Sequence, residues 1–347
     1  MRTSLYIFLF ALFTNCLYAQ VSDFASTDFT RADKVAQLHR GASLENLPVL
    51  AHQLTSTLST DVEKFRAIYI WVCQNIKGDN TQFTKVNKKR KKLQYDSISF
   101  MRWNQEYKKT VFKKLLKRKK TMCTGYAYLI KELCYLANIP CEIVDGYGRS
   151  VASNIKELEM ANHSWNAIQL NNKWYLCDAT WSSGYLNEYN SFVTAYNDGY
   201  FLTDPFLFGK NHFPLEQKWL LNAQVTATGF VEAPLVYGET FENNITPIHP
   251  KNMDISINKN DEITFSFKSA NNVLNKNIAL VHYVGSEEKT LKIDNTKKVD
   301  NIISFKHTFK NRGIYDTHLK VNGDIVATYI INVKKSDSKS NIAFHQN

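Results

Sequence analysis

The chain has 347 residues, of which 44% are hydrophobic and 13% are aromatic. This is enough apolar surface for folded cores, so the composition excludes a disordered protein, and the length predicts two domains. The formal net charge of +11 is concentrated, because 15 Lys or Arg and only two acidic residues lie between Lys85 and Lys120. No recognition motif accompanies this charge, which argues against nucleic acid as a partner.

Residues 1–19 are typical of an export signal. Arg2 supplies the positive charge, Leu5 to Phe13 form an apolar run, and a cleavage site follows near Ala19. The run is short for a membrane span, and no later segment is long enough for one. We therefore expect an exported protein that is periplasmic, secreted or at the cell surface. The residue before Cys16 is unfavourable for lipidation, so a lipid anchor there is not expected.

A lead segment over residues 20–45 precedes a first predicted domain over residues 46–225. Two short helices are expected between Asp33 and Leu58, with breaks near Gly41 and Pro48. A longer helix begins at Thr60, because a threonine followed three residues later by glutamate forms a capping box. Its apolar positions recur at helical spacing as far as Ile76.

The basic segment, residues 85–120, is predicted to be an insertion in this domain. Its charge is gathered in two runs, Lys88–Lys92 and Lys117–Lys120. The preferred interpretation is a solvated surface. The alternative is a patch that binds an anionic envelope polymer, anionic lipid or an acidic protein.

The period of the apolar pattern changes after this insertion. A helix is predicted from Cys123 to Ala137. Three antiparallel strands are predicted after it, Cys141–Gly148, His163–Leu170 and Lys173–Asp178, and Asn171-Asn172 forms a tight turn between the last two. A helix followed by a meander indicates an α+β domain. The stretch 187–221 is aromatic and irregular, and we expect it to wrap this domain.

Residues 234–335 are predicted to form an all-β domain. Alternating strands are expected at 263–267, 278–284, 302–309 and 325–333, and no helix pattern interrupts them. Gly313-Ile314-Tyr315 resembles the tyrosine-corner region of an immunoglobulin-like sandwich. We expect a binding or spacer domain, followed by a polar tail over residues 336–347.

Five cysteines remain after removal of the signal, and this odd number leaves at least one free thiol. No Cys-x-x-Cys spacing occurs, which argues against a zinc or redox motif. Four cysteines lie among apolar residues and are predicted to be small buried side chains: Cys73, Cys134, Cys141 and Cys177. Cys123 differs, because its neighbours are threonine, glycine and a basic run.

Cys123, His163 and Asp178 are the candidate catalytic residues. A helix start stabilises a thiolate at Cys123, and the small residues Thr124 and Gly125 would let backbone amides approach a developing oxyanion. The predicted hairpin brings His163 and Asp178 to the same end of two strands, as a base and its orienting carboxylate require. The alternatives are a structural cysteine, a surface histidine and an aspartate that caps the next turn.

Several segments together resemble the transglutaminase-like superfamily, most closely bacterial relatives of the kyphoscoliosis-peptidase group. They lie within residues 46–225 and comprise Ala67–Val72, Cys123–Ala127, His163–Asn166, Asp178–Trp181, Tyr200–Pro205 and His212–Pro214. The resemblance implies an α+β transglutaminase-like, papain-like core with a helix-borne cysteine and an antiparallel sheet, followed by the immunoglobulin-like sandwich.

By this resemblance Cys123 is the nucleophile, His163 the general base and acid, and Asp178 the residue that orients the histidine. It implies thiol-dependent acyl transfer or hydrolysis on peptide or protein amides, by a peptidase, deamidase or transglutaminase, with no metal or organic cofactor. The group often has Tyr-Asp where this chain has Gly78-Asp79, so no side chain is assigned to an oxyanion hole. The alternative is a non-catalytic binding or adaptor protein of the same fold at the cell envelope.

Overall fold

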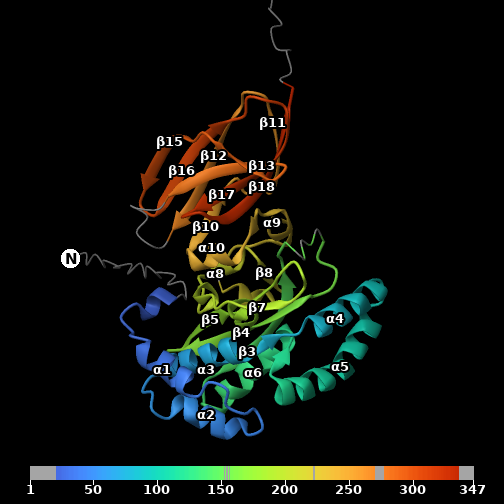
Figure 1. The fold of residues 1–347 in the computed structure, drawn as a ribbon, viewed down its shortest axis with the longest axis vertical. Helices are drawn as coiled ribbons and strands as arrows, with labels where there is room; N and C mark the ends of the chain where they lie inside the picture. The colour runs from blue at the N-terminus through green and yellow to red at the C-terminus, as the bar shows by residue number, and fades with distance from the viewer. Residues whose placement is uncertain are drawn as a thin grey trace, which may run out of the picture.

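The computed structural model describes residues 21–151, 153, 155, 157–221, 223–269 and 277–335. The expected export signal with Cys16 and the expected polar tail lie outside the described residues. Among those described, no helix is both long and apolar enough to cross a membrane. An N-terminal α+β part and a C-terminal β part follow one another along the long axis of the molecule (Figure 1).

The N-terminal part begins with helices that pack around one almost fully buried helix. Their bounds are η1 (Val21–Phe24), α1 (Thr30–Leu38), α2 (Leu47–Thr55) and α3 (Asp61–Asn75). The predicted capping box opens α3, where Glu63 N–H donates to Thr60 Oγ1 at 3.3 Å and Thr60 N–H to Glu63 Oε2 at 3.0 Å. Pro48 lies in the first turn of α2, where a missing N–H costs nothing, so it begins this helix instead of breaking it.

The basic segment forms a helical hairpin, which its charge pattern did not predict. The hairpin consists of α4 (Asn80–Lys92) and α5 (Ser97–Arg118), and it extends from the side of the domain (Figure 1). Asp79 and Asp96 begin the two helices by accepting from Gln82 N–H at 3.2 Å and Ser99 N–H at 3.0 Å. The short strands β1 (Lys77–Gly78) and β2 (Lys120–Thr121) pair in parallel and close the hairpin at its base.

The predicted helix and meander are present and form the centre of this part. α6 (Cys123–Leu136) is followed by a sheet in the order β5-β4-β3-β8, with β3 (Cys141–Gly148), β4 (His163–Leu170), β5 (Lys173–Cys177) and β8 (His212–Pro214), all antiparallel. Asn171 and Asn172 adopt φ values of 49° and 61°, which gives the tight turn between β4 and β5. Strand β8 was not predicted, and it places a segment distant in sequence beside β3.

Short elements connect β5 to the C-terminal part. They are α7 (Ala179–Ser183), β6 (Gly184–Leu186), β7 (Phe192–Thr194), η2 (Asp198–Tyr200), α8 (Pro205–Phe208), η3 (Gln217–Leu220), α9 (Ala227–Glu232), β9 (Leu235–Val236) and α10 (Gly238–Glu242).

The expectation that no helix interrupts residues 234–335 is wrong, because α10 lies there. Five residues are too few for a periodic signal, and tertiary contacts hold this helix: Phe241 stacks on Tyr200 at 4.2 Å and Thr240 Oγ1 donates to Val326 O at 2.6 Å.

Two sheets make up the C-terminal part and share one core. One sheet runs β10-β12-β16-β15 and the other β11-β18-β17-β13-β14, with β9 also on β18. The strands are β10 (Ile245–His249), β11 (Asp254–Asn258), β12 (Glu262–Ser269), β13 (Ile278–Val284), β14 (Glu287–Leu291), β15 (Asp294–Val299), β16 (Ile302–Thr308), β17 (Gly313–Val321) and β18 (Asp324–Lys334). Tyr315 Oη donates to Asn311 O at 3.1 Å, a bond of the tyrosine-corner kind. The immunoglobulin-like assignment itself remains a prediction.

Candidate active site

Cys123 is the first residue of α6, and the backbone leading to it is fixed by the base of the hairpin. Asp79 N–H donates to Thr121 O at 2.7 Å beside the paired strands β1 and β2. In the described structure no side chain caps the start of α6, and Cys123 is 8% exposed there. Partial positive charge at a helix start favours a thiolate.

Gly125 has a packing role at the start of α6. Its N–H donates to Met122 O at 2.9 Å, so this amide is not free to bind an oxyanion. A Cβ at position 125 would overlap the side chain of Thr121, which is fully buried. The glycine therefore allows α6 to pack against β2, and the expectation that small residues here let other backbone amides approach an oxyanion stays a prediction.

The structure brings His163 and Asp178 into contact. His163 begins β4, Asp178 directly follows β5, and His163 Nε2 lies 2.7 Å from Asp178 Oδ2. Asp178 Oδ1 accepts from the backbone N–H groups of Thr180 at 2.7 Å and Trp181 at 3.3 Å. Asp178 thus caps α7 with one oxygen and contacts the imidazole with the other, so the two interpretations of this residue hold together.

Cys123 contacts the same imidazole. Burial alone would raise the pKa of the thiol, but the hydrogen bond and positive charge of His163 outweigh burial and lower it, with a further bond from Ser164 N–H. Burial alone would lower the pKa of His163, and Asp178 followed by Cys123 raises it to about 10. Because Nε2 faces Asp178, Nδ1 is the ring nitrogen available to the sulfur. The arrangement favours a thiolate beside an imidazolium.

Asp178 remains ionised in this buried place. Burial would raise its pKa, yet the charges and hydrogen bonds of His163 and then His212 hold it well below its ordinary value. Trp181 stacks on the His163 ring with centroids 4.7 Å apart, and Trp165 lies behind it at 6.0 Å. Water is therefore excluded from most of the ring, and its electrostatic contacts act in a medium of low polarity.

His212 is a member of this cluster that the sequence reasoning missed. It begins β8, is fully buried, and places Nε2 3.2 Å from Asp178 Oδ2. Burial lowers its pKa to about 4 despite the nearby carboxylate, so the neutral ring donates one N–H to Asp178. With Nε2 carrying the proton, Nδ1 is an acceptor, so the Asn211 amide 2.7 Å away has to direct its NH2 group, and not Oδ1, toward this nitrogen. The His-Phe-Pro motif was the available signal, but no strand was expected there.

The same cluster has the spacing of a possible metal site. Ligand atoms of His163, Asp178 and His212 lie within 4.8 Å of one another. The two contacts to Asp178 are 2.7 Å and 3.2 Å long, which are hydrogen-bond distances, and each uses the ring nitrogen that would have to bind the metal. The residues therefore fit a hydrogen-bonded network better than a metal centre.

The other four cysteines behave differently from Cys123. Among the described residues Cys73, Cys134, Cys141 and Cys177 are free and buried, as the sequence predicted. Burial raises the pKa of Cys73, Cys134 and Cys177, whereas that of Cys123 is lowered. Only Cys123 among these five has an imidazole partner that favours its thiolate.

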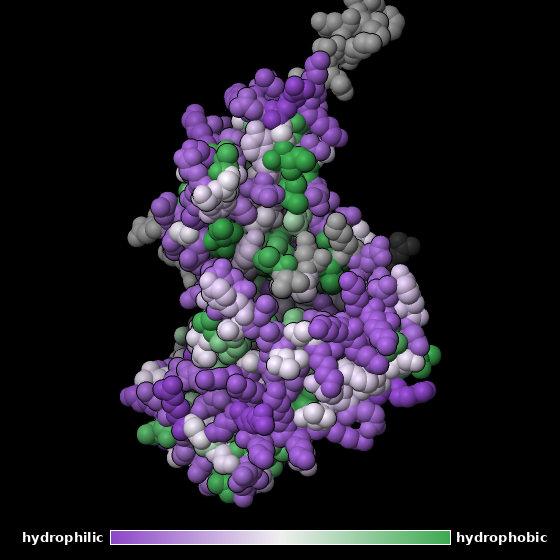
Figure 2. All heavy atoms as spheres, turned by 45° about the vertical axis from the view of Figure 1, so that its right-hand side comes forward, coloured by the Kyte–Doolittle hydropathy of each residue, from purple (hydrophilic) through white to green (hydrophobic). Residues whose placement is uncertain are grey.

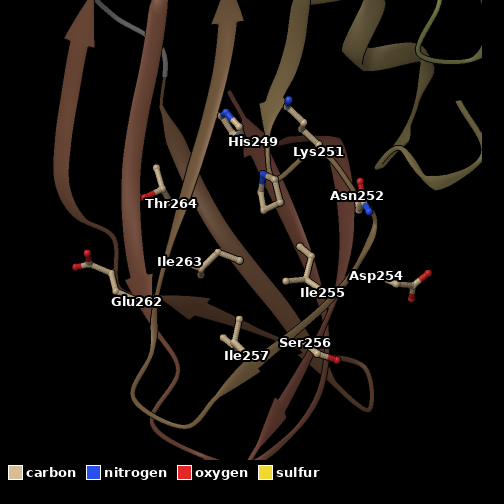
Figure 3. A pocket seen from close by; sticks show the side chains of 11 residues that line it. His249, Lys251, Asn252, Asp254, Ile255, Ser256, Ile257, Glu262, Ile263 and Thr264 are labelled. Carbon is tan, nitrogen blue, oxygen red and sulfur yellow. The ribbon is translucent and has the colours of Figure 1, made fainter. Parts of the chain in front are cut away.

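An open groove is found in the C-terminal part, away from this cluster. It lies between β11 and β12 and is lined by side chains that include His249, Ile255, Ile257, Glu262 and Ile263 (Figure 3). Cys123, His163 and Asp178 do not line it. The groove is therefore separate from the candidate active site.

Comparison with known proteins identifies the same part of the chain that holds the candidate active site. The sequence model of the transglutaminase-like superfamily matches residues 48–179, which include Cys123, His163 and Asp178. Kyphoscoliosis peptidase from Homo sapiens is 32% identical over 211 residues, which are 59% of this chain and 29% of that protein. Hillarin from Drosophila melanogaster is 25% identical over 224 residues, 60% of this chain and 25% of hillarin.

Among solved structures, a match to the crystal structure of a TGase covers 51% of this chain and 38% of the TGase chain. The two are 17% identical over it, and the TM-score is 0.28. The chain spans less than a third of the length of the two curated relatives. The family match confirms the resemblance that the motifs predicted. The chain therefore carries a transglutaminase-like domain over residues 48–179 and is similar over 59% of its length to kyphoscoliosis peptidase.

Proposed function

We propose that this protein is a thiol enzyme that cleaves or transfers peptide or protein amides, with Cys123, His163 and Asp178 as its catalytic residues. The observation that carries the proposal is the buried contact of one imidazole with both the Asp178 carboxylate, at 2.7 Å, and the Cys123 thiol. A base held by a third group is what turns a thiol into an efficient nucleophile.

The reaction begins with the thiolate of Cys123 attacking the carbonyl carbon of an amide. A C–S bond forms and the carbonyl oxygen becomes an oxyanion. His163 then gives its proton to the leaving nitrogen, the C–N bond breaks, and a thioester remains. Asp178 keeps the ring oriented and stabilises its positive charge throughout.

A second nucleophile completes the cycle. His163 takes a proton from water, the oxygen attacks the thioester, and the C–S bond breaks to give a carboxylic acid and the free thiolate. An amine in place of water would give a new amide. We favour hydrolysis, because it is the activity named for the similar kyphoscoliosis peptidase.

The test is covalent labelling of Cys123, followed by intact-protein mass spectrometry. Iodoacetamide and an electrophilic peptide probe should each add one label at pH 6, where an ordinary thiol is largely protonated. Cys123→Ala should abolish this label. Cys141→Ala is the matched control, because Cys141 is 7% exposed and Cys123 8%, so exposure alone would make them react alike.

Two results would contradict the proposal. Equal labelling of the wild type and Cys123→Ala would eliminate Cys123 as the reactive thiol. A labelling profile that follows a free cysteine's dependence on pH would favour the non-catalytic adaptor instead. Turnover of a peptide amide in the presence and absence of an added amine then separates hydrolysis from cross-linking.

A further inference from the structure

Both ends of the basic hairpin, α4 with α5, lie at the candidate active site. Gly78 is paired with Thr121, only two residues before Cys123, and α4 begins directly after this pair. Asp79, which precedes α4, forms an ion pair with Lys114, near the C-terminal end of α5. A molecule bound along the base of the hairpin would therefore lie next to the thiol.

Aromatic rings, and not carboxylates, face the cations of α4. Three contacts join the helices, with cation-to-centroid distances of 4.5 Å, 5.6 Å and 5.2 Å: Lys85 over Tyr107, Lys89 over Trp103 and Arg90 over Phe100. A ring attracts a cation without cancelling its charge. The packing of the hairpin thus leaves its positive charge available to a ligand.

Most of the basic side chains in this segment have no acidic partner. Of the 15 between Lys85 and Lys120, a range that the structure describes completely, only Lys109 and Lys114 form ion pairs. Lys88, Lys91 and Lys92 are exposed near the end of α4. Figure 2, which brings the hairpin forward, shows mainly hydrophilic residues over this part of the surface. Such a concentration of one charge attracts anions.

One face of α4 also carries buried polar atoms that lack a partner. Gln82, Val86 and Arg90 are four residues apart and share this face. Within the part of the chain that the structure describes, Gln82 Nε2, Gln82 Oε1 and Arg90 Nε are buried without a hydrogen bond. Buried polar groups are normally satisfied, so these atoms point to a ligand.

Arg90 links this face to the nucleophile. Its Nη1 donates to Asn87 Oδ1 at 2.6 Å, and its guanidinium lies over Phe100. Burial lowers the pKa of this guanidinium, and the charge that opposes the effect is the Cys123 thiolate. Arg90 is therefore a cation within electrostatic reach of Cys123, and the ion pairs of the described residues do not include it.

We propose that the basic hairpin is the substrate-docking surface of the enzyme, and that it selects polypeptides with acidic residues near the amide that Cys123 attacks. This inference rests on the proposed function. A polypeptide supplies each group that the face of α4 lacks: a carboxylate for Arg90, and a carbonyl oxygen and an N–H for the Gln82 amide. A lipid headgroup supplies an anion but no amide for the thiol.

The test compares two peptide probes that carry the same thiol-reactive acyloxymethyl ketone. One has glutamates beside the reactive group and the other has glutamines. The acidic probe should label Cys123 about tenfold faster at low salt, and 0.5 M salt should remove most of this difference. The triple variant Lys88→Gln/Lys91→Gln/Lys92→Gln should lose the preference, as should Arg90→Gln, whereas Arg90→Lys should keep most of it.

Matched controls separate docking from a general charge effect and from a damaged site. Lys268→Gln/Lys297→Gln/Lys298→Gln removes three exposed charges from the C-terminal part and should preserve the preference. Iodoacetamide is uncharged and reports the state of the thiol. In the hairpin variants the loss with the acidic probe should exceed any loss with iodoacetamide at least fivefold.

The outcomes distinguish this inference from the proposed function. Equal rates for the two probes at a Cys123 that iodoacetamide labels would overturn the docking surface alone. Failure of every reagent to label Cys123 would overturn the enzyme, and fluorescence anisotropy with the same peptides lacking the ketone would then decide docking by itself. Binding to vesicles containing phosphatidylserine, without a preference between the peptides, would assign the hairpin to lipid and overturn the inference.

Discussion

Replacing Asp178 with Asn changes the charge of the candidate site but hardly its shape. The new side chain can still cap α7 through its oxygen, which now accepts from Thr180 and Trp181. Its NH2 group would then face His163 Nε2, which lies 2.7 Å from the carboxylate oxygen of the wild type. The ring would have to accept at Nε2 and carry its proton on Nδ1, so the nitrogen facing the sulfur could no longer take a proton.

The size of the effect follows from the electrostatics of His163. Its pKa is raised from 6.5 to about 10, and Asp178 raises it more than Cys123 does. At 1.36 kcal/mol per tenfold change, this corresponds to about 5 kcal/mol in favour of the imidazolium. If Asp178 supplies somewhat more than half, its loss costs about 3 kcal/mol, or roughly a hundredfold in the population of the thiolate–imidazolium pair.

The assay is the rate of iodoacetamide labelling of Cys123 between pH 4 and pH 10, followed by mass spectrometry. In the Asp178→Asn variant the profile should move upward in pH, toward that of an ordinary thiol. Asp204→Asn is the matched control, since Asp204 caps α8 through contacts of 2.8 Å and 3.3 Å to backbone N–H groups. A profile of Asp178→Asn that coincides with those of the wild type and this control would refute the reasoning.

The stability of the same variant should depend on pH in a defined direction. The contribution of the lowered Asp178 pKa is present above its unfolded value of 3.8 and is lost in acid. The contribution of the raised His163 pKa is complete below 6.5 and is lost as the pH rises through about 10. The difference in free energy of unfolding between wild type and variant should therefore be largest from about pH 4 to pH 6.5. Urea titrations at pH 5 and pH 10 check this.

Three further outcomes are expected. Turnover of a peptide amide should rise as Cys123 ionises below its ordinary pKa of 9.0 and fall as His163 loses its proton near pH 10; a rate that still increases above pH 10 would contradict the acid role of His163. His212→Leu removes a hydrogen bond to the buried Asp178 carboxylate and should lower the free energy of unfolding by about 1.5–3 kcal/mol in urea titrations. His212→Gln keeps a donor and should be much less affected, whereas equal losses would indicate a packing role only. Gly125→Ala should lower the free energy of unfolding by about 1–3 kcal/mol through overlap with Thr121. Addition of Thr121→Ala should recover most of this loss in urea titrations, and no recovery would show that the overlap is not the cause.

The sequence by itself determined the local elements on which the site is built. The capping box at Thr60, the Asn171-Asn172 turn and the helix start at Cys123 depend on residues only a few positions apart, and all are present. The apolar periods of two and of three to four residues also placed β4, β5 and α6 correctly. The order of Cys123, His163 and Asp178 along these elements therefore indicated the site before any tertiary contact was known.

Only the tertiary structure decided how the site is completed. His212 joins Asp178 because β8 pairs with β3, a contact between segments far apart in the chain that no local pattern encodes. The basic segment became a hairpin because rings on α5 accept the cations of α4, an arrangement that requires both helices. The lowered pKa of Cys123 likewise depends on the charged ring of His163, a residue 40 positions away whose effect outweighs that of burial. Burial and long-range contact arise only when the whole chain packs.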